Sequence, residues 1–291
     1  MKVLLVDFDS KIPNLALMKL STWHKQKGDL VGFDIQDPDQ VYVSVVFSKN
    51  KSQAAGLTTM FPNSMISFGG PGWDLQNFLP EEIEKIKPDY DLYPSEYSQG
   101  YTTRGCIRNC PFCVVPEKEG KIKIWQHPEE FHDNRFNTCM IMDNNLFASP
   151  YEWIKTIFSW FEDHGVKMLS PQGWDARLLT EEMASLLKCV KHPKGLHFAW
   201  DNMSDEPKVI RAINILKDAG FNLKSDVSFY VLCGYNTTFE QDLYRCNKLR
   251  DLGTNSFVMQ YHKKDPRLRR LAKWANRRWA YWASPFEVIQ V

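Results

Sequence analysis

Three cysteines lie within eight residues, in the segment Cys106-Ile-Arg-Asn-Cys110-Pro-Phe-Cys113. Offsets of four and three residues allow one flexible loop to place three thiolates on one face of a cubane iron–sulfur cluster. Because three thiolates leave one iron without a protein ligand, that iron could bind a substrate or cofactor, as the open position of a catalytic zinc site does. The alternative is a structural zinc site, which needs a fourth ligand. His127 and His132 are candidates, but they lie in no familiar zinc pattern.

The composition is that of a globular protein. The chain has 291 residues, of which 43% are hydrophobic and 24% charged, and this excludes a collagen-like repeat or a disulfide-stapled miniprotein. The net charge of +1 gives no global attraction to nucleic acid or membrane. Met1–Asp7 is too short for a secretory signal, and no apolar run approaches the roughly 20 residues of a membrane span. We therefore expect a cytoplasmic protein without membrane contact, whose seven cysteines are ligands, catalysts or core residues rather than bridges.

Two patterns of alternating strands and helices are expected along the chain. Over the first 70 residues, strands are expected at 2–7, 30–33, 41–47 and 65–68, with helices at 13–28 and 50–60. This alternation predicts a small, Rossmann-like open sheet that ends in the turn Gly69-Gly70-Pro71-Gly72, which could let backbone approach a ligand. Further strands are expected at 138–142, 167–169, 196–200, 227–232 and 256–261, with amphipathic helices between them. Repeated units of this kind predict a full or partial parallel barrel.

The run Thr103–Cys113 closely resembles the cluster loop of the radical S-adenosylmethionine (radical SAM) enzymes. In that family three cysteines hold a [4Fe-4S] cluster, and the amino and carboxylate groups of SAM chelate the fourth iron. One-electron reduction cleaves SAM to a 5′-deoxyadenosyl radical, which abstracts a hydrogen atom. The resemblance implies a partial (β/α)6 barrel whose first strand ends at Tyr101–Arg104. It also implies a one-electron donor such as flavodoxin or ferredoxin.

Eight further residues look like SAM-binding points of this family: Phe112, Asp143, Asn144, Asn145, Gln172, Asp175, Arg177 and Asp201. They lie at the expected carboxyl ends of strands, where barrels build their sites. The family usually carries Gly-Gly-Glu at the position of Asp143-Asn144-Asn145, and the form found here resembles cobalamin-linked members. Each also has an ordinary explanation, since Asn and Asp commonly form turns and Asp175 and Arg177 could be a surface ion pair. Cys233, at the end of the fifth strand, is a candidate radical relay or thiol acceptor, and otherwise a small core residue like Cys139, Cys189 and Cys246.

Residues 1–87 resemble the cobalamin-binding domain that precedes the barrel in one radical SAM subgroup. The region looks shorter than a full cobalamin domain, and it lacks the Asp-x-His-x-x-Gly sequence that supplies an axial histidine in many cobalamin proteins. We therefore expect a reduced relative that has lost cobalamin, with retention of cobalamin as the alternative.

The C-terminal segment is basic and aromatic. The last thirty residues hold eight Lys or Arg against two acidic residues, and Trp274, Trp279, Tyr281 and Trp282 lie among the arginines of 269–282. Arginines suit phosphates and aromatic rings suit bases, which favours RNA or another nucleic acid as substrate. The alternative is a helix that packs its tryptophans on the barrel, and a peptide or small-molecule substrate stays open.

The predicted organisation is a Rossmann-like domain at 1–87, a radical SAM barrel at 88–262 and a basic, aromatic helix at 263–291. The predicted activity is reductive cleavage of SAM and modification of an unidentified substrate. One alternative is a cobalamin-dependent radical SAM methyltransferase. An alternative of another class is a non-catalytic iron–sulfur or zinc protein that binds nucleic acid.

Overall fold

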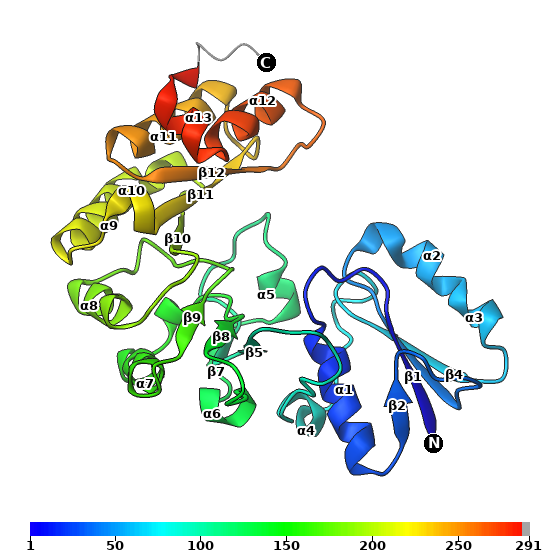
Figure 1. Cartoon of the computed structure of the whole chain (residues 1–291). Coiled ribbons are helices and arrows are strands. Elements are labelled where there is room, and N and C mark those ends of the chain that lie inside the picture. The colour runs from blue at the N-terminus through cyan, green and yellow to red at the C-terminus, as the bar shows by residue number, and fades with distance from the viewer. Residues whose placement is uncertain (287–291) are drawn as a thin grey trace.

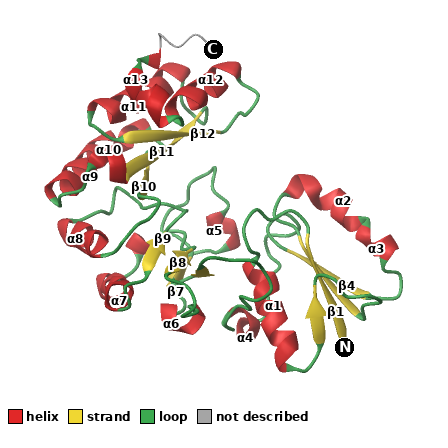
Figure 2. Cartoon of the chain, viewed as in Figure 1, coloured by secondary structure: helices red, strands yellow, loops and turns green. Residues whose placement is uncertain are grey.

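The computed structural model describes residues 1–286, and they form a mixed α/β protein built on parallel sheets (Figures 1 and 2). The expected α/β class is therefore confirmed. The predicted tail at 263–291 lies partly outside the described residues, because these end at Phe286. Among the described residues, no helix combines the length and apolar character that crossing a bilayer requires.

The N-terminal sheet has four parallel strands in the order β2-β1-β3-β4. Its elements are β1 (Lys2–Asp7), α1 (Leu15–Gln26), β2 (Leu30–Gly32), β3 (Gln40–Ser44), η1 (Ser48–Asn50), α2 (Lys51–Ala55), α3 (Leu57–Met60), β4 (Met65–Gly69) and α4 (Glu81–Glu84). Alternate residues of β1 point to opposite faces. Val3 and Leu5 pack with α1, whereas Leu4 packs with Ala54 of α2, so helices cover both faces. The single helix expected at 50–60 is instead three short pieces, η1, α2 and α3.

Two three-stranded parallel sheets follow, in the orders β5-β8-β9 and β10-β11-β12. Their strands are β5 (Ser98–Gly100), β8 (Thr138–Ile141), β9 (Lys167–Leu169), β10 (Leu196–Ala199), β11 (Val227–Cys233) and β12 (Asn255–Gln260). A parallel bridge links Trp174, in the segment after β9, to Phe198 of β10, and Trp174 N donates to His197 O at 2.7 Å. Within each of the two sheets, neighbouring strands follow the order of the chain.

Helices accompany these strands. They are α5 (Val115–Lys118), α6 (Pro128–Phe131), η2 (Leu146–Ala148), α7 (Tyr151–Asp163), α8 (Glu181–Cys189), η3 (Met203–Asp205), α9 (Glu206–Asp218), α10 (Leu223–Asp226), α11 (Phe239–Asp251), α12 (Pro266–Ala275) and α13 (Arg278–Ala283). Of these, α7, α8, α9 and α11 lie on the outer side of the strands (Figure 1). Gly165, Gly220 and Gly253 have positive φ just after α7, α9 and α11, as glycines that end helices commonly do. The connected helices and strands share one large apolar core.

The C-terminal segment forms two helices rather than one. Leu268, Leu271 and Trp274 of α12 are buried, and Tyr281 of α13 is fully buried. Trp274 Nε1 donates to Ser284 O at 3.0 Å. The packed-helix alternative thus describes Trp274 and Tyr281, whereas Trp279 is exposed over 72% of its surface.

Candidate functional site

The cysteine loop leaves one short hairpin strand and returns to the other. β6 (Thr103–Arg104) pairs antiparallel with β7 (Lys123–Ile124), and Cys106 N donates to Gly120 O at 3.1 Å. Gly105 has a φ of +86°, and a Cβ there would lie 2.4 Å from Lys121 O. Only glycine fits this position, because any side chain would collide with backbone. The base of the loop is therefore fixed, and the sulfurs lie in the span between its ends.

N–H groups point at two of the three sulfurs. Cys106 Sγ accepts from Arg108 N at 3.3 Å and from Asn145 Nδ2 at 3.5 Å, and Cys113 Sγ accepts from Val115 N at 3.5 Å. Cys106 and Cys110 are partly buried and Cys113 is exposed. Such donors favour sulfur in its charged, metal-binding form. Across residues 1–286, however, no group of three or more His, Cys, Asp or Glu side chains lies in a geometry that could hold a metal ion.

Asp175 joins the loop to the end of the third strand. Its carboxylate accepts from Arg108 Nε at 3.1 Å, Arg177 Nε at 2.6 Å and Asn145 Nδ2 at 3.2 Å. Although burial acts to raise the pKa of Asp175, Arg177 and Arg108 hold that pKa below its usual value. Arg177 also reaches Asp205 at 3.4 Å. The structure thus brings the predicted residues Asn145, Asp175 and Arg177 together beside the cysteines, and Arg108 is the link.

One polar atom of this group has no partner. Asn145 Oδ1 is buried and accepts no hydrogen bond from any described residue. An unpaired buried acceptor costs free energy unless a ligand or water fills the vacancy in its hydrogen bonding. The amide therefore offers an acceptor for an incoming donor, such as an ammonium group.

The side chains of Asp143 and Asn144 hold the start of the cysteine loop in place. The carboxylate of Asp143 is buried and accepts hydrogen bonds from the backbone N–H and the hydroxyl of both Thr102 and Thr103. Burial raises the pKa of Asp143 to about 6, although these hydrogen bonds act to lower it. Asn144 Oδ1 accepts from Gly105 N at 2.9 Å. Both side chains are engaged in hydrogen bonds within the protein.

Asp201 lies within electrostatic reach of the loop. Burial raises the pKa of this carboxyl group, while Arg245 and Arg177 act to lower it. Burial likewise raises the pKa of the Cys110 thiol; Arg177 acts to lower it, and Asp201 acts to raise it. Asp201 therefore belongs to the same cluster of charges as Arg177.

The remaining predicted residues lie apart from this cluster or at its margin. Gln172 is exposed, and the Phe112 ring packs edge-to-face on Tyr235 at 5.2 Å. Cys233 is fully buried in the core beside Cys246, and the hydrogen bond with Cys246 and burial raise the pKa of its thiol. The buried position matches the core alternative for Cys233 and gives it no access to a substrate. Cys189, expected in the core, is exposed.

Two residues of the site were not predicted from the sequence. Arg108 was read only as part of the polar loop, and Tyr235 carries no motif. Its position between Cys106 and Cys110 is the sequence feature that could have indicated a role for Arg108. Tyr235 gave no local signal, because its contact with Phe112 spans more than a hundred residues.

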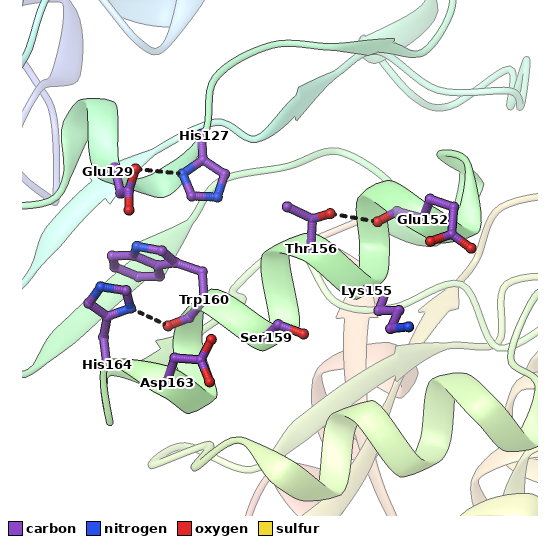
Figure 3. Close-up of a pocket in the computed structure, with 9 residues that line it drawn as sticks. All are labelled: His127, Glu129, Glu152, Lys155, Thr156, Ser159, Trp160, Asp163 and His164. Carbon is purple, nitrogen blue, oxygen red and sulfur yellow. Dashed lines mark hydrogen bonds and ion pairs between the residues drawn. The ribbon is translucent and has the colours of Figure 1, made fainter.

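A hollow of about 440 Å³ lies elsewhere, on the outer surface of α6 and α7 (Figure 3). Its lining is His127, Glu129, Glu152, Lys155, Thr156, Ser159, Trp160, Asp163 and His164. None of the predicted SAM-binding residues or loop cysteines lines it. The two histidines considered as zinc ligands contact Trp160 instead, with ring centroids at 6.4 Å for His127 and 5.1 Å for His132.

The glycine-rich turn after β4 packs against the chain itself. A Cβ on Gly70 would lie 2.4 Å from Val45 O, and one on Gly72 would lie 2.6 Å from the Phe47 backbone. The carboxylate of Asp9 is occupied by Val46 N and Phe47 N, at 2.7 and 3.0 Å. The glycines therefore make room for protein backbone, in place of the ligand approach suggested by the sequence.

The sequence matches no model of a known protein family and no curated protein. The function must therefore be argued from the residues of the site themselves.

Proposed function

We propose that the protein is a radical SAM enzyme that binds a [4Fe-4S] cluster through Cys106, Cys110 and Cys113. The observation that carries the proposal is the three-cysteine loop, whose fixed base and N–H···S contacts suit thiolate ligands. The donor set fits the group, since three thiolates leave one iron open for SAM. When bound and reduced, the cluster supplies the electron that cleaves SAM to a 5′-deoxyadenosyl radical.

The order of the strands supports a matching architecture. The two parallel sheets, β5-β8-β9 and β10-β11-β12, each follow the order of the chain, and the Trp174–Phe198 bridge links the segment after β9 to β10. A right-handed series of such units curves into an open (β/α)6 barrel. In that arrangement Asn145, Asp175 and Asp201 follow the carboxyl ends of successive strands, the face on which barrels place their sites.

The protein's own residues would bind and orient SAM. Asn145 Oδ1, buried and without a partner among the described residues, would accept from the ammonium group of SAM. Asp175 holds Asn145 and Arg177 in place, because its carboxylate bonds both. Arg177 keeps positive charge near Cys110 and acts to lower the pKa of that thiol. The electron would come from an external one-electron donor.

The test is anaerobic reconstitution with iron and sulfide, followed by reduction in the presence of SAM. We expect four irons per chain with sulfide, and release of 5′-deoxyadenosine. Serine in place of any one of Cys106, Cys110 or Cys113 should abolish both. The matched control is Cys189→Ser, since Cys189 is an exposed thiol outside the loop.

Other outcomes contradict the proposal. One zinc per chain without sulfide would support a non-catalytic zinc protein. A loop variant that retained four irons and SAM cleavage would remove the cluster assignment. Methylated product formed only with added cobalamin would support the methyltransferase alternative.

A further inference from the structure

Large apolar side chains are exposed along one face of β12 and just beyond its end. Phe257, Met259 and Tyr261 are exposed over 43%, 48% and 48% of their surface, whereas the alternate residues Ser256 and Val258 are buried and Gln260 is half-buried. Alternate residues of a strand share a face, so the three exposed side chains line the same side of the sheet. Contiguous exposure of this kind marks a binding surface more often than a random feature of the exterior.

Neighbouring strands extend this surface toward the cysteine loop. Tyr230 of β11 is in register with Phe257, with ring centroids 5.7 Å apart, and His197 of β10 stacks on Tyr230 at 5.1 Å. At the other end, the rings of Tyr261 and Tyr235 are 4.8 Å apart, and Tyr235 contacts Phe112. We name the set His197, Tyr230, Phe257, Met259, Tyr261 and Tyr235 the aromatic face. The aromatic face extends from His197 on β10 to Tyr235, which contacts Phe112 between Cys110 and Cys113.

Cationic side chains lie at both ends of the aromatic face. Lys263 and Lys264 are exposed and follow Tyr261 after His262. At the opposite end, Lys194 and Arg278 act electrostatically on His197. The acidic residue closest in sequence to the two lysines, Asp265, is already paired with Arg267 at 3.5 Å. The charges that flank the rings are thus complementary to an anionic ligand.

A peptide added as a further strand is the main rival occupant, because β12 is an edge strand. That edge is blocked at its centre. Asn276 Oδ1 accepts from Val258 N at 2.7 Å, and Asn276 Nδ2 donates to Val258 O at 3.1 Å. The backbone groups of Val258, at the centre of this edge, are therefore not available to a peptide, and the surface offers rings and cations instead.

We propose that the aromatic face binds single-stranded nucleic acid as the substrate of the enzyme proposed above. Bases stack on Phe257 and Tyr261, and Lys263 and Lys264 contact the phosphates. A chain bound this way leads along the sheet to Phe112 and the cysteine loop. That the ligand is a substrate rests on the proposed function. The inference assigns nucleic-acid recognition to the sheet, whereas the sequence had suggested the C-terminal segment.

The experiment measures binding of fluorescein-labelled oligo(U) and oligo(dT) of about 12 nucleotides by anisotropy, with heparin, a duplex and an acidic peptide as comparisons. The two oligonucleotides separate RNA from DNA as the source of the same chemistry. We expect tighter binding of a single strand than of the duplex or heparin, because only unpaired bases can stack. Phe257→Ala and Tyr261→Ala should each weaken binding about ten-fold or more, and Tyr261→Phe should retain it.

Matched controls separate stacking from charge and from folding. Trp279→Ala removes an exposed ring outside the aromatic face and should change nothing. Lys263→Gln and Lys264→Gln should each reduce the log–log salt slope by about 0.7, the value for one phosphate contact on a single strand. Melting temperatures should stay close to that of the parent, since the altered side chains are exposed.

Three results would overturn the inference: binding unaffected by the aromatic replacements, equal binding of heparin and oligonucleotide, or preference for the acidic peptide. Iron, sulfide and 5′-deoxyadenosine are measured on the same preparation. If the protein carries the cluster and cleaves SAM but binds no oligonucleotide, the proposed function stands and the proposed role of the aromatic face is rejected. Oligonucleotide binding that depends on the aromatic face, in a protein without a cluster, supports the surface and rejects the enzyme.

Discussion

Asp143 holds two backbone amides and two hydroxyls from a buried position. Replacing it with alanine would leave Thr102 N and Thr103 N without their acceptor. Each unsatisfied buried donor costs about 1–3 kcal/mol, so we expect Asp143→Ala to lower the free energy of unfolding by roughly 2–6 kcal/mol. Urea unfolding measures this, with exposed Asp34→Ala as control. Loss of SAM binding without loss of stability would instead support the SAM contact that the resemblance implies.

The three cysteines on which the proposed cluster rests are close in sequence, so their spacing can be read without the fold. The contacts that surround them cannot. Asp143 is about forty residues from Thr102 and Thr103, and Asp175 is 67 residues from Arg108. Which acceptor meets which donor over such separations is decided by the packing of strands, and no local pattern records it.

At the scale of elements, α12 and α13 show how a break in a helix changes which of its side chains are buried. A single continuous helix over 269–282 would place Arg278 on the buried stripe with Leu271 and Trp274. The chain instead interrupts the helix at Asn276, whose side chain bonds Val258. The second helix therefore starts in a new phase, with Tyr281 buried and Arg278 exposed. Periodicity predicted the packing of the tryptophans in part, and the tertiary contact of Asn276 determined the rest.

Trp274 and Trp279 provide a matched test of this packing. Trp274 is buried, and its indole donates to Ser284 O, whereas Trp279 is exposed. We expect Trp274→Ala to lower the free energy of unfolding by about 3–5 kcal/mol, the usual result of removing a buried aromatic ring. Trp279→Ala should stay within about 0.5 kcal/mol of the parent. Equal effects of the two replacements would contradict the observed docking.

His192, between α8 and β10, makes stability depend on pH. Burial lowers its pKa from 6.5 to about 4, and Nε2 donates to Leu187 O at 2.9 Å. Below pH 6.5 the unfolded chain binds a proton that the folded protein does not, so stability is lost as the pH falls from 6.5 toward 4. The loss from this group between pH 7 and pH 5 is about 2 kcal/mol.

We expect His192→Gln to remove that part of the pH dependence in urea unfolding. Glutamine retains an N–H donor for Leu187 O but does not titrate in this range. The same replacement at exposed His262 is the control. Parallel stability–pH curves for the parent and His192→Gln would show that the histidine does not titrate differently in the two states.

On the scale of the whole molecule, the sequence predicted two α/β regions and the structure shows how they are joined. Composition and alternation gave the parallel sheets, because burial of strands on both faces leaves a pattern in each segment. The junction between the two regions leaves no such pattern in the sequence. It includes Lys19 on α1, Glu84 on α4, and Arg104 and Glu119 at the two ends of the cysteine loop. A carboxylate of the N-terminal region thus neutralises a cation next to Gly105.

Glu84 is the shared member of this junction, and its removal tests the coupling. Its carboxylate lies 2.9 Å from Arg104 Nη1 and 3.5 Å from Lys19 Nζ, and all three side chains are mostly buried. Glu84→Gln leaves two buried cations with less compensation, so we expect a loss of about 3–5 kcal/mol in urea unfolding. Glu81→Gln, on the same helix but exposed and paired only with Lys85, should change stability by less than about 0.5 kcal/mol. Hydrogen exchange should accelerate together in α1 and at the Cys106 amide, because Arg104 connects the two. Faster exchange in α1 alone would show that the N-terminal sheet and the cysteine loop are stabilised independently.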